Sequence, residues 1–208
     1  MSTDTTVSQA ETPAPQFTLD RRRAVPALIG DHEDFLIVSG LAGTSKDIAA
    51  LTDDGGHAYT MAGAMGAATM TGLGLALARP DKRVLVVTGD GELLMNVGSL
   101  ATVAVLNPSN LGIVCVDNGH YGETGNQLSH TSLGVDLEKI AAGSGIKVTA
   151  AVESEAGLAA GARLLRESNA ACFVLLRVSP DEPPPAYKRL LDPAACKVRF
   201  RTALLGRP

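Results

Sequence analysis

The chain alternates between short apolar runs and longer segments with a helical distribution of apolar residues. The runs are rich in Val, Ile and Leu and are apolar at consecutive positions, which is typical of strands buried on both faces. We predict strands at Phe35–Val38, Val84–Val87, Leu111–Val116, Ile146–Thr149 and Cys172–Arg177. We predict helices at Ser45–Leu51, Ala64–Ala78, Met95–Leu106, near Val135–Ala142, and at Glu155–Glu167.

This strand–helix alternation predicts an α/β fold, in which helices cover both faces of a mostly parallel, doubly wound sheet and form three layers. Residues 1–19 are polar and contain Pro and Thr, so we expect a disordered leader there. The folded domain is expected over residues 20–180. Residues 181–208 begin with a proline-rich stretch, which favours an extended connector that leads to a short terminal helix or arm.

Composition narrows the range of partners. The 208 residues are 45% hydrophobic and carry a formal net charge of −4, which gives no electrostatic reason to expect nucleic acid or an anionic membrane. No apolar run approaches the roughly eighteen residues of a membrane-spanning helix, and no signal-peptide core is visible at the N-terminus. The spacing of Cys115, Cys172 and Cys196 fits neither a disulfide framework nor a metal site, so we expect a cytoplasmic location.

Two strand ends carry the most informative polar residues. Asp90 lies in a Gly-Asp-Gly turn after one predicted strand, and Asn118 follows the next strand along the chain. The carboxyl ends of parallel strands share one edge of a sheet, where ligands bind in open α/β folds. A carboxylate, an amide and a carbonyl form an oxygen-only ligand set that suits Mg²⁺. Each turn alone is an ordinary strand-ending turn, but the pair at this spacing is much less ordinary.

This layout resembles the diphosphate-binding domain of thiamine diphosphate enzymes, in which GDG is followed about thirty residues later by Asn. The resemblance implies that Asp90 and Asn118 bind Mg²⁺ through side chains and His120 through its carbonyl oxygen. Gly91 and Glu92 would donate backbone N–H groups to the diphosphate at a helix N-terminus, although Glu92 replaces an expected small residue. The resemblance places these residues at the cofactor: Thr44, Ser45, Gly63, Met65, Gly89, Asp90, Gly91, Glu92, Asn118, His120 and Tyr121.

A second element, MAGAMG at residues 61–66, strengthens the resemblance. It implies that the Gly63 carbonyl accepts a hydrogen bond from the cofactor's 4′-amino group and that Met65 holds the two cofactor rings in a V. These two residues are therefore the expected catalytic contributors. Taken alone, Met65 favours the interpretation of a residue that fills a gap in the core, and its place upstream of GDG favours the functional role.

Other residues keep two interpretations. Thr44 and Ser45 either donate to the diphosphate or cap a helix that begins at Ser45. The loop at 119–130 either closes over the cofactor or is a solvated surface loop, and its candidates for the substrate's anionic head are Thr124, Asn126, Gln127 and His130. His32 and His57 are read as structural. The small residues of 72–78 lack a dinucleotide-binding pattern and favour close approach of another helix, across a subunit interface or within the chain.

A complete thiamine diphosphate site also needs a pyrimidine-binding domain that supplies a glutamate to N1′. Only 34 residues precede the first predicted strand, so we expect a separate partner subunit. Among split members, the chain particularly resembles sulfopyruvate decarboxylase β subunits and the C-terminal half of phosphonopyruvate decarboxylases. The implied function is the diphosphate- and Mg²⁺-binding subunit of a hetero-oligomeric 2-oxo acid decarboxylase that forms an aldehyde and is inactive without its partner. The alternatives are a carboligase subunit of the acetolactate-synthase type and a non-catalytic scaffold.

Overall fold

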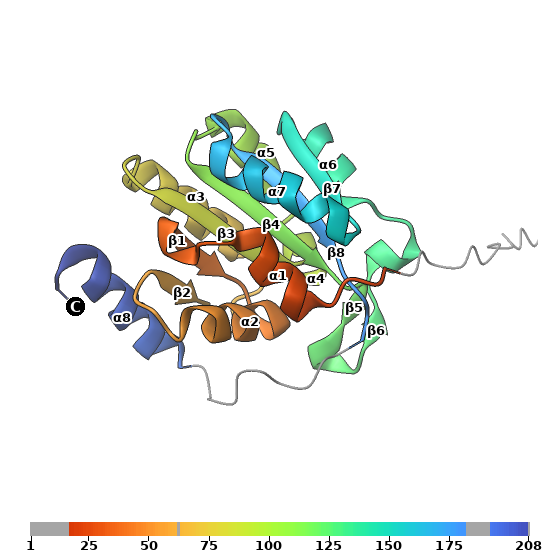
Figure 1. The fold of residues 1–208 in the computed structure, drawn as a ribbon, viewed down its shortest axis with the longest axis horizontal. Helices are drawn as coiled ribbons and strands as arrows, with labels where there is room; N and C mark the ends of the chain where they lie inside the picture. Colours follow the sequence, from red (N-terminus) through yellow and green to blue (C-terminus); the bar gives the residue numbers. More distant parts are fainter. Residues whose placement is uncertain (1–16, 62, 182–191, 208) are drawn as a thin grey trace, which may run out of the picture.

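A parallel six-stranded sheet forms the middle layer of the protein (Figure 1). The computed structural model describes residues 17–61, 63–181 and 192–207. The strands lie in the order β2-β1-β3-β4-β8-β7, and every pairing in this sheet is parallel. Their bounds are Phe35–Ser39 (β1), Ala58–Thr60 (β2), Arg83–Gly89 (β3), Leu111–Asp117 (β4), Val148–Val152 (β7) and Cys172–Arg177 (β8).

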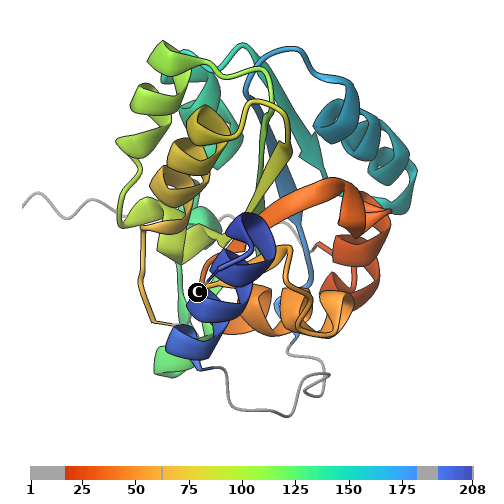
Figure 2. The same ribbon diagram turned by 90° about the vertical axis from the view of Figure 1, so that its left-hand side faces the viewer.

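Helices cover both faces of the sheet, as Figure 2 shows. One face carries α1 (Arg21–Ile29), α2 (Ala42–Thr52) and α7 (Glu155–Glu167), and the other carries α3 (Ala68–Ala78), α4 (Asp90–Leu94), α5 (Ser99–Leu106) and α6 (Leu137–Gly143). The last helix, α8 (Pro193–Leu205), packs against the edge strand β2. The expected three-layer α/β fold is confirmed.

The strands are apolar on both faces because each face belongs to a different core. In β3, Val84 and Val86 pack into the cluster under α3 and α5, whereas Leu85 and Val87 pack under α1 and α7. Neighbouring side chains of a strand point to opposite faces, so a run of four apolar residues supplies both cores. All of β4 is buried for the same reason.

Several element boundaries differ from the predicted ones. The predicted helix Met95–Leu106 begins at Ser99, because α4 follows directly on β3 and a turn separates it from α5. The predicted helix Ala64–Ala78 begins at Ala68, because Gly63 and Gly66 have positive φ angles, which an α-helix does not accommodate. The predicted strand Ile146–Thr149 lies two residues later, at β7.

The strand β2 and the helix α1 are among the elements that were not predicted from the sequence. The strand β2 is only three residues long. The helix α1 contains Pro26, which removes one helical hydrogen bond and hides the pattern. The Asp20 carboxylate caps α1 by accepting a hydrogen bond from the Arg22 backbone N–H at 2.9 Å.

The described residues near both ends of the chain can be compared with the expected bounds of the leader, the folded domain and the connector. Residues 1–16 of the expected leader lie outside the described residues, but Leu19 is buried in the core, so the ordered part begins before residue 20. Residues 182–191 of the expected connector also lie outside the described residues. The expected short terminal helix is α8. No helix in the described ranges is long and apolar enough to cross a membrane, and the three cysteines are buried free thiols.

The small residues of α3 serve packing within the chain. A Cβ atom on Gly72 would lie 2.1 Å from the Cγ2 atom of Val86, so the absence of a side chain lets α3 rest directly on β3. Gly74, two residues later, has nothing within 4 Å of the same position. The close approach at Gly72 is therefore to the chain's own sheet and not, as expected, to another helix, while Gly74 faces away from the sheet.

These two glycines give a matched test of the packing. Gly72→Ala should lower the free energy of unfolding by about 1–3 kcal/mol, because the added methyl group overlaps a stiff, buried valine. Gly74→Ala should leave it unchanged or raise it by about 0.5–1 kcal/mol, through its helix propensity alone. Urea denaturation followed by circular dichroism measures both changes. Equal effects of the two substitutions would contradict this packing.

Candidate functional site

A cavity of about 450 Å³ opens at the carboxyl ends of β1, β3 and β4. The strand order reverses between β1 and β3, and such switch points hold ligands in open α/β sheets. The cavity is lined by segments that follow all three strands: residues 41–44 after β1, residues 89–92 after β3, and residues 118–124 after β4.

Most residues predicted for the cofactor meet at this cavity. Those that line it are Thr44, Met65, Gly89, Asp90, Gly91, Glu92, Asn118, His120 and Tyr121. Ser45 is buried and does not line it, and Gly63 lies outside its lining on an exposed turn. The two turns found in the sequence therefore converge, as strand pairing requires, since Gly89 of β3 is in register with Val116 of β4.

The predicted metal-binding set consists of oxygen atoms. Asp90 begins α4, and its Oδ2 atom accepts a hydrogen bond from the Ser129 hydroxyl and lies 3.2 Å from the Thr131 hydroxyl oxygen. Asn118 Oδ1 accepts a hydrogen bond from the His120 N–H at 3.1 Å, which leaves this amide oxygen one lone pair.

Among the described residues, no three His, Cys, Asp or Glu side chains form a metal site on their own. A mixed oxygen set with few carboxylates fits Mg²⁺, which completes its octahedron with phosphate oxygens and water.

Two acidic side chains, the predicted ligand Asp90 and its neighbour Asp117, lie at the edge of the sheet that carries the predicted metal-binding residues. Asp90 and Asp117 are 3% and 4% exposed, and they end neighbouring strands. Burial first and the Asp117 charge second raise the pKa of Asp90 to about 6. Burial also raises the pKa of Asp117, although Thr131, the Gly119 N–H and Arg177 oppose that effect. A divalent cation would relieve this unfavourable concentration of negative charge.

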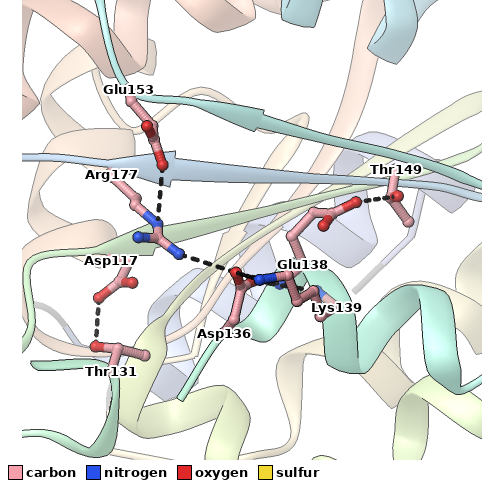
Figure 3. Close-up of polar contacts among 8 residues, drawn as sticks. All are labelled: Asp117, Thr131, Asp136, Glu138, Lys139, Thr149, Glu153 and Arg177. Carbon is pink, nitrogen blue, oxygen red and sulfur yellow. Dashed lines mark hydrogen bonds and ion pairs between the residues drawn. The ribbon is translucent and has the colours of Figure 1, made fainter. Parts of the chain in front are cut away.

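An ion-pair network lies behind Asp117 (Figure 3). Arg177, at the end of β8, approaches Asp136 at 3.4 Å and Glu153 at 3.6 Å, and its guanidinium lies over the Phe17 ring. The Thr131 hydroxyl donates to Asp117 at 2.7 Å. Arg177 is thus the cation that faces the acidic edge from the side away from the cavity.

Small residues let neighbouring groups approach the cavity floor. A Cβ on Gly91 would lie 2.3 Å from the Tyr121 ring, so this ring rests on the backbone of the Gly-Asp-Gly turn. A Cβ on Gly43 would lie 2.4 Å from the Arg21 guanidinium, which pairs with Asp47 at 2.6 Å. A glycine at 91 is therefore required by the packing of the Tyr121 ring.

Glu92 turns its side chain away from the metal-binding set. Its Oε2 atom accepts a hydrogen bond from the Leu41 N–H at 3.3 Å, and its carboxylate fills the space that a Cβ on Gly40 would occupy. The side chain is buried, Oε1 has no hydrogen-bond partner among the described residues, and burial raises the pKa of Glu92. An acidic side chain beside a diphosphate would be repelled unless it points away. The Glu92 carboxylate lies between β1 and β3, against Gly40 and Leu41.

The hydroxyls after β1 do not cap α2. This helix begins at Ala42 rather than at Ser45. The Thr44 hydroxyl donates to the Leu41 carbonyl at 2.8 Å, and the Ser45 hydroxyl donates to the Ala42 carbonyl at 2.9 Å. The capping interpretation is therefore wrong, and Thr44 alone of the two faces the cavity.

Met65 is not a core residue. Its side chain is 42% exposed and lines the cavity, so the core-filling interpretation is wrong. The turn that presents it is tied to the end of α4, because Asn96 donates its side-chain N–H to the Gly66 carbonyl at 3.0 Å.

The loop after Asn118 folds into a small hairpin. Its parts are β5 (His120–Tyr121), η2 (Gly122–Thr124), β6 (Gln127–Leu128) and η3 (His130–Leu133). The Tyr121 hydroxyl lies 3.1 Å from Nδ1 of His130. Of the four substrate candidates, Thr124 alone lines the cavity, while Asn126, Gln127 and His130 are exposed outside it.

Sequence reasoning missed the residues that support the site. Arg21, Lys46 and Glu123 line the cavity, and Lys46 pairs with Glu123 at 3.2 Å. Ser129 and Thr131 hold Asp90, and only their hydroxyl type in the polar segment after Asn118 is visible in the sequence. His32 and His57 stack on each other, and neither lines this cavity, in agreement with a structural role.

Comparison with known proteins adds a family to this geometry. Residues 42–175 match the family model of the C-terminal TPP binding domain of thiamine pyrophosphate enzymes. The chain belongs to this family. The sulfopyruvate decarboxylase subunit beta of Methanocaldococcus jannaschii is 46% identical over 118 residues, which cover 57% of this chain and 61% of that protein.

Two further relatives agree with the family. The phosphonopyruvate decarboxylase of Streptomyces viridochromogenes is 35% identical over 175 residues, covering 84% of this chain and 43% of that protein. A Mycobacterium smegmatis protein described as thiamin diphosphate-dependent has a crystal structure with a TM-score of 0.64 at 22% identity, covering 78% of this chain and 32% of that one. This structural likeness supports the fold, and the chain spans only part of each of these proteins.

The metal-binding assignment gives a direct test. Asp90→Asn should abolish Mg²⁺-dependent binding of thiamine diphosphate, because a neutral amide replaces the carboxylate in the ligand set. Asp81→Asn, the same chemical change in an acid that does not line this cavity, should retain it. Isothermal titration calorimetry with and without EDTA measures both. Wild-type affinity in the Asp90 variant would remove Asp90 from the metal site.

The charge at Asp90 also predicts a pH-dependent stability. Its pKa of about 6 in the metal-free fold exceeds the ordinary 3.8, so ionisation costs stability as the pH rises from about 4 to about 6, and this cost persists above that range. In EDTA at pH 7.5, Asp90→Asn should therefore be more stable than wild type by on the order of 1–3 kcal/mol. Below pH 4 this charge contribution should vanish. Denaturant titrations at several pH values measure the difference in free energy of unfolding between the two proteins. The other acidic residues are the same in both proteins, so this difference reports on residue 90.

Proposed function

We propose that this chain is the diphosphate- and Mg²⁺-binding subunit of a thiamine diphosphate-dependent 2-oxo acid decarboxylase. The observation that carries the proposal is the convergence of Asp90, Asn118 and His120 on one cavity, in a chain of the thiamine-pyrophosphate family. The relatives named sulfopyruvate and phosphonopyruvate decarboxylase support an anionic 2-oxo acid as substrate and an aldehyde as product. The acetolactate-synthase alternative lacks an observation of comparable weight.

In this proposal each residue has a separate task. Asp90, Asn118 and the His120 carbonyl hold the metal, while the N–H groups of Gly91 and Glu92 face the diphosphate at the start of α4. Met65 supports the cofactor rings from the exposed side of the cavity, and the Gly63 carbonyl faces the aminopyrimidine. The cofactor supplies the electron sink for loss of CO₂, and the protein supplies binding and orientation.

We also propose a separate partner subunit and a cytoplasmic location. The name "subunit beta" of the archaeal relative supports a second chain that would provide the pyrimidine-binding domain and its N1′ glutamate. The exposed side of α3 and α5 supports the same idea, because Met70, Leu77 and Val105 are large apolar side chains at the surface. A scaffold role fits less well, since a retired site has no need for Asp90, Asn118 and an exposed Met65 together.

The proposal predicts that the purified chain alone does not decarboxylate 2-oxo acids, even with saturating Mg²⁺ and thiamine diphosphate. In this proposal the N1′ glutamate belongs to the partner's pyrimidine-binding domain, so proton exchange at N1′ lacks its carboxylate in the isolated chain. Adding a subunit with a pyrimidine-binding domain should restore activity, and its glutamate-to-glutamine variant should not. Association should slow hydrogen exchange in α3. Turnover by the isolated chain at the rate of the complex would overturn the two-subunit proposal.

A further inference from the structure

Among the described residues, a closely spaced cluster of hydroxyls and carboxylates adjoins the predicted ligand set and shares Asp90 with it. Ser129 and Thr131 place two hydroxyls between the carboxylates of Asp90 and Asp117. The Ser129 hydroxyl bonds to Asp90 Oδ2 and lies 2.8 Å from the Thr131 hydroxyl. The Thr131 oxygen lies 3.2 Å from Asp90 and 2.7 Å from Asp117. Ser129 is 0% exposed, so its hydroxyl is withdrawn from bulk solvent.

The number of protons fixes how this cluster is bonded. Each hydroxyl has one proton to donate, and an ionised carboxylate can only accept. The arrangement that serves both acids has Ser129 donating to Asp90 and Thr131 donating to Asp117, the shorter of its two contacts. Asp90 Oδ2 is then held by Ser129, and Asp90 lines the cavity together with Asn118 and His120.

Backbone hydrogen bonds of Ser129 and Gly119 close the hairpin in the same place. The Ser129 N–H donates to the Gly119 carbonyl at 2.7 Å, and the Gly119 N–H donates to Asp117 Oδ1 at 3.0 Å. The first residues of this segment, Asn118 and His120, are predicted metal ligands, and its last residues bond to the third ligand, Asp90. Both ends of the hairpin are thus fastened to the acidic edge of the sheet.

We propose that Ser129 and Thr131 are positioning residues that couple the metal-binding carboxylate to closure of the 119–131 hairpin. This inference rests on the proposed Mg²⁺–diphosphate site. Closing the hairpin orients Asp90 for the metal, and a metal on Asp90 favours the hydroxyl contacts that close the hairpin. Such a linkage is reciprocal: the factor by which closure tightens metal binding is the factor by which the metal favours closure.

The chain offers conservative variants and a matched control. Thr131→Val keeps the shape and removes the hydroxyl, Thr131→Ser restores it, and Ser129→Ala removes the donor to Asp90. Ser132→Ala is the control, because its hydroxyl donates to the Gly119 carbonyl at 2.7 Å in the same segment without touching either carboxylate. The probe is Mn²⁺ added to the full chain with excess thiamine diphosphate, with bound metal followed by electron paramagnetic resonance.

We expect Thr131→Val and Ser129→Ala to weaken Mn²⁺ binding at least about tenfold, the usual effect of losing a group that orients a metal ligand. Thr131→Ser and Ser132→Ala should bind Mn²⁺ with an affinity within about threefold of wild type. This difference is well below the tenfold loss expected when a positioning hydroxyl is removed. Hydrogen–deuterium exchange supplies the second readout: metal and cofactor together should protect residues 119–128 in wild type and in Thr131→Ser, but much less in Thr131→Val.

The outcomes separate this inference from the function on which it rests. If wild type binds no Mn²⁺ with the cofactor, the proposed site itself fails. If wild type binds and the two hydroxyl-free variants bind equally well, the hydroxyls are structural and the coupling is wrong. If Ser132→Ala loses as much affinity as Thr131→Val, hairpin anchoring in general matters and the carboxylate contacts do not. Thermal unfolding of each variant confirms that the comparison is made between folded proteins.

Discussion

The placement of two buried carboxylates side by side is the constraint on which the site depends. Parallel strands bring Asp90 and Asp117 to the same edge, and the apolar residues that make β3 and β4 good strands also remove water from their ends. Ionising both acids there is unfavourable without a cation. The hydroxyls of Ser129 and Thr131, the nearby N–H groups and Arg177 reduce this cost, and a divalent ion supplies the remaining charge.

The charge of the cavity as a whole extends this argument. Its lining contains Arg21, Arg22 and Lys46 together with Asp47, Asp90, Glu92 and Glu123, so three positive and four negative side chains leave a formal charge of −1. A bound Mg²⁺ reverses this sign, and the diphosphate returns the site to a negative charge. The cavity lining therefore carries no excess of positive charge.

The fold was predictable because each strand is a continuous apolar run, and the convergence of Asp90 and Asn118 followed from parallel pairing. The missed elements have physical causes: α1 contains Pro26, β2 has three residues, and the glycines before α3 delay its start. The roles of Gly72 and Glu92 depend on tertiary neighbours, namely Val86 and Gly40, that lie far from them along the chain. Such contacts leave no periodic signal in a single sequence.

The hairpin shows most clearly why a site is more than its ligands. Its strands are two residues each, and a pair that short does not hold its shape in water alone. Its position therefore depends on anchors: Gly119 to Asp117, Ser129 to Gly119 and Asp90, and Thr131 to Asp117. Three of these four contacts end on a carboxylate whose charge state depends on the metal. A hairpin that is weak by itself and fastened to the metal-binding edge is ordered by what that edge binds, so binding and closure become one event.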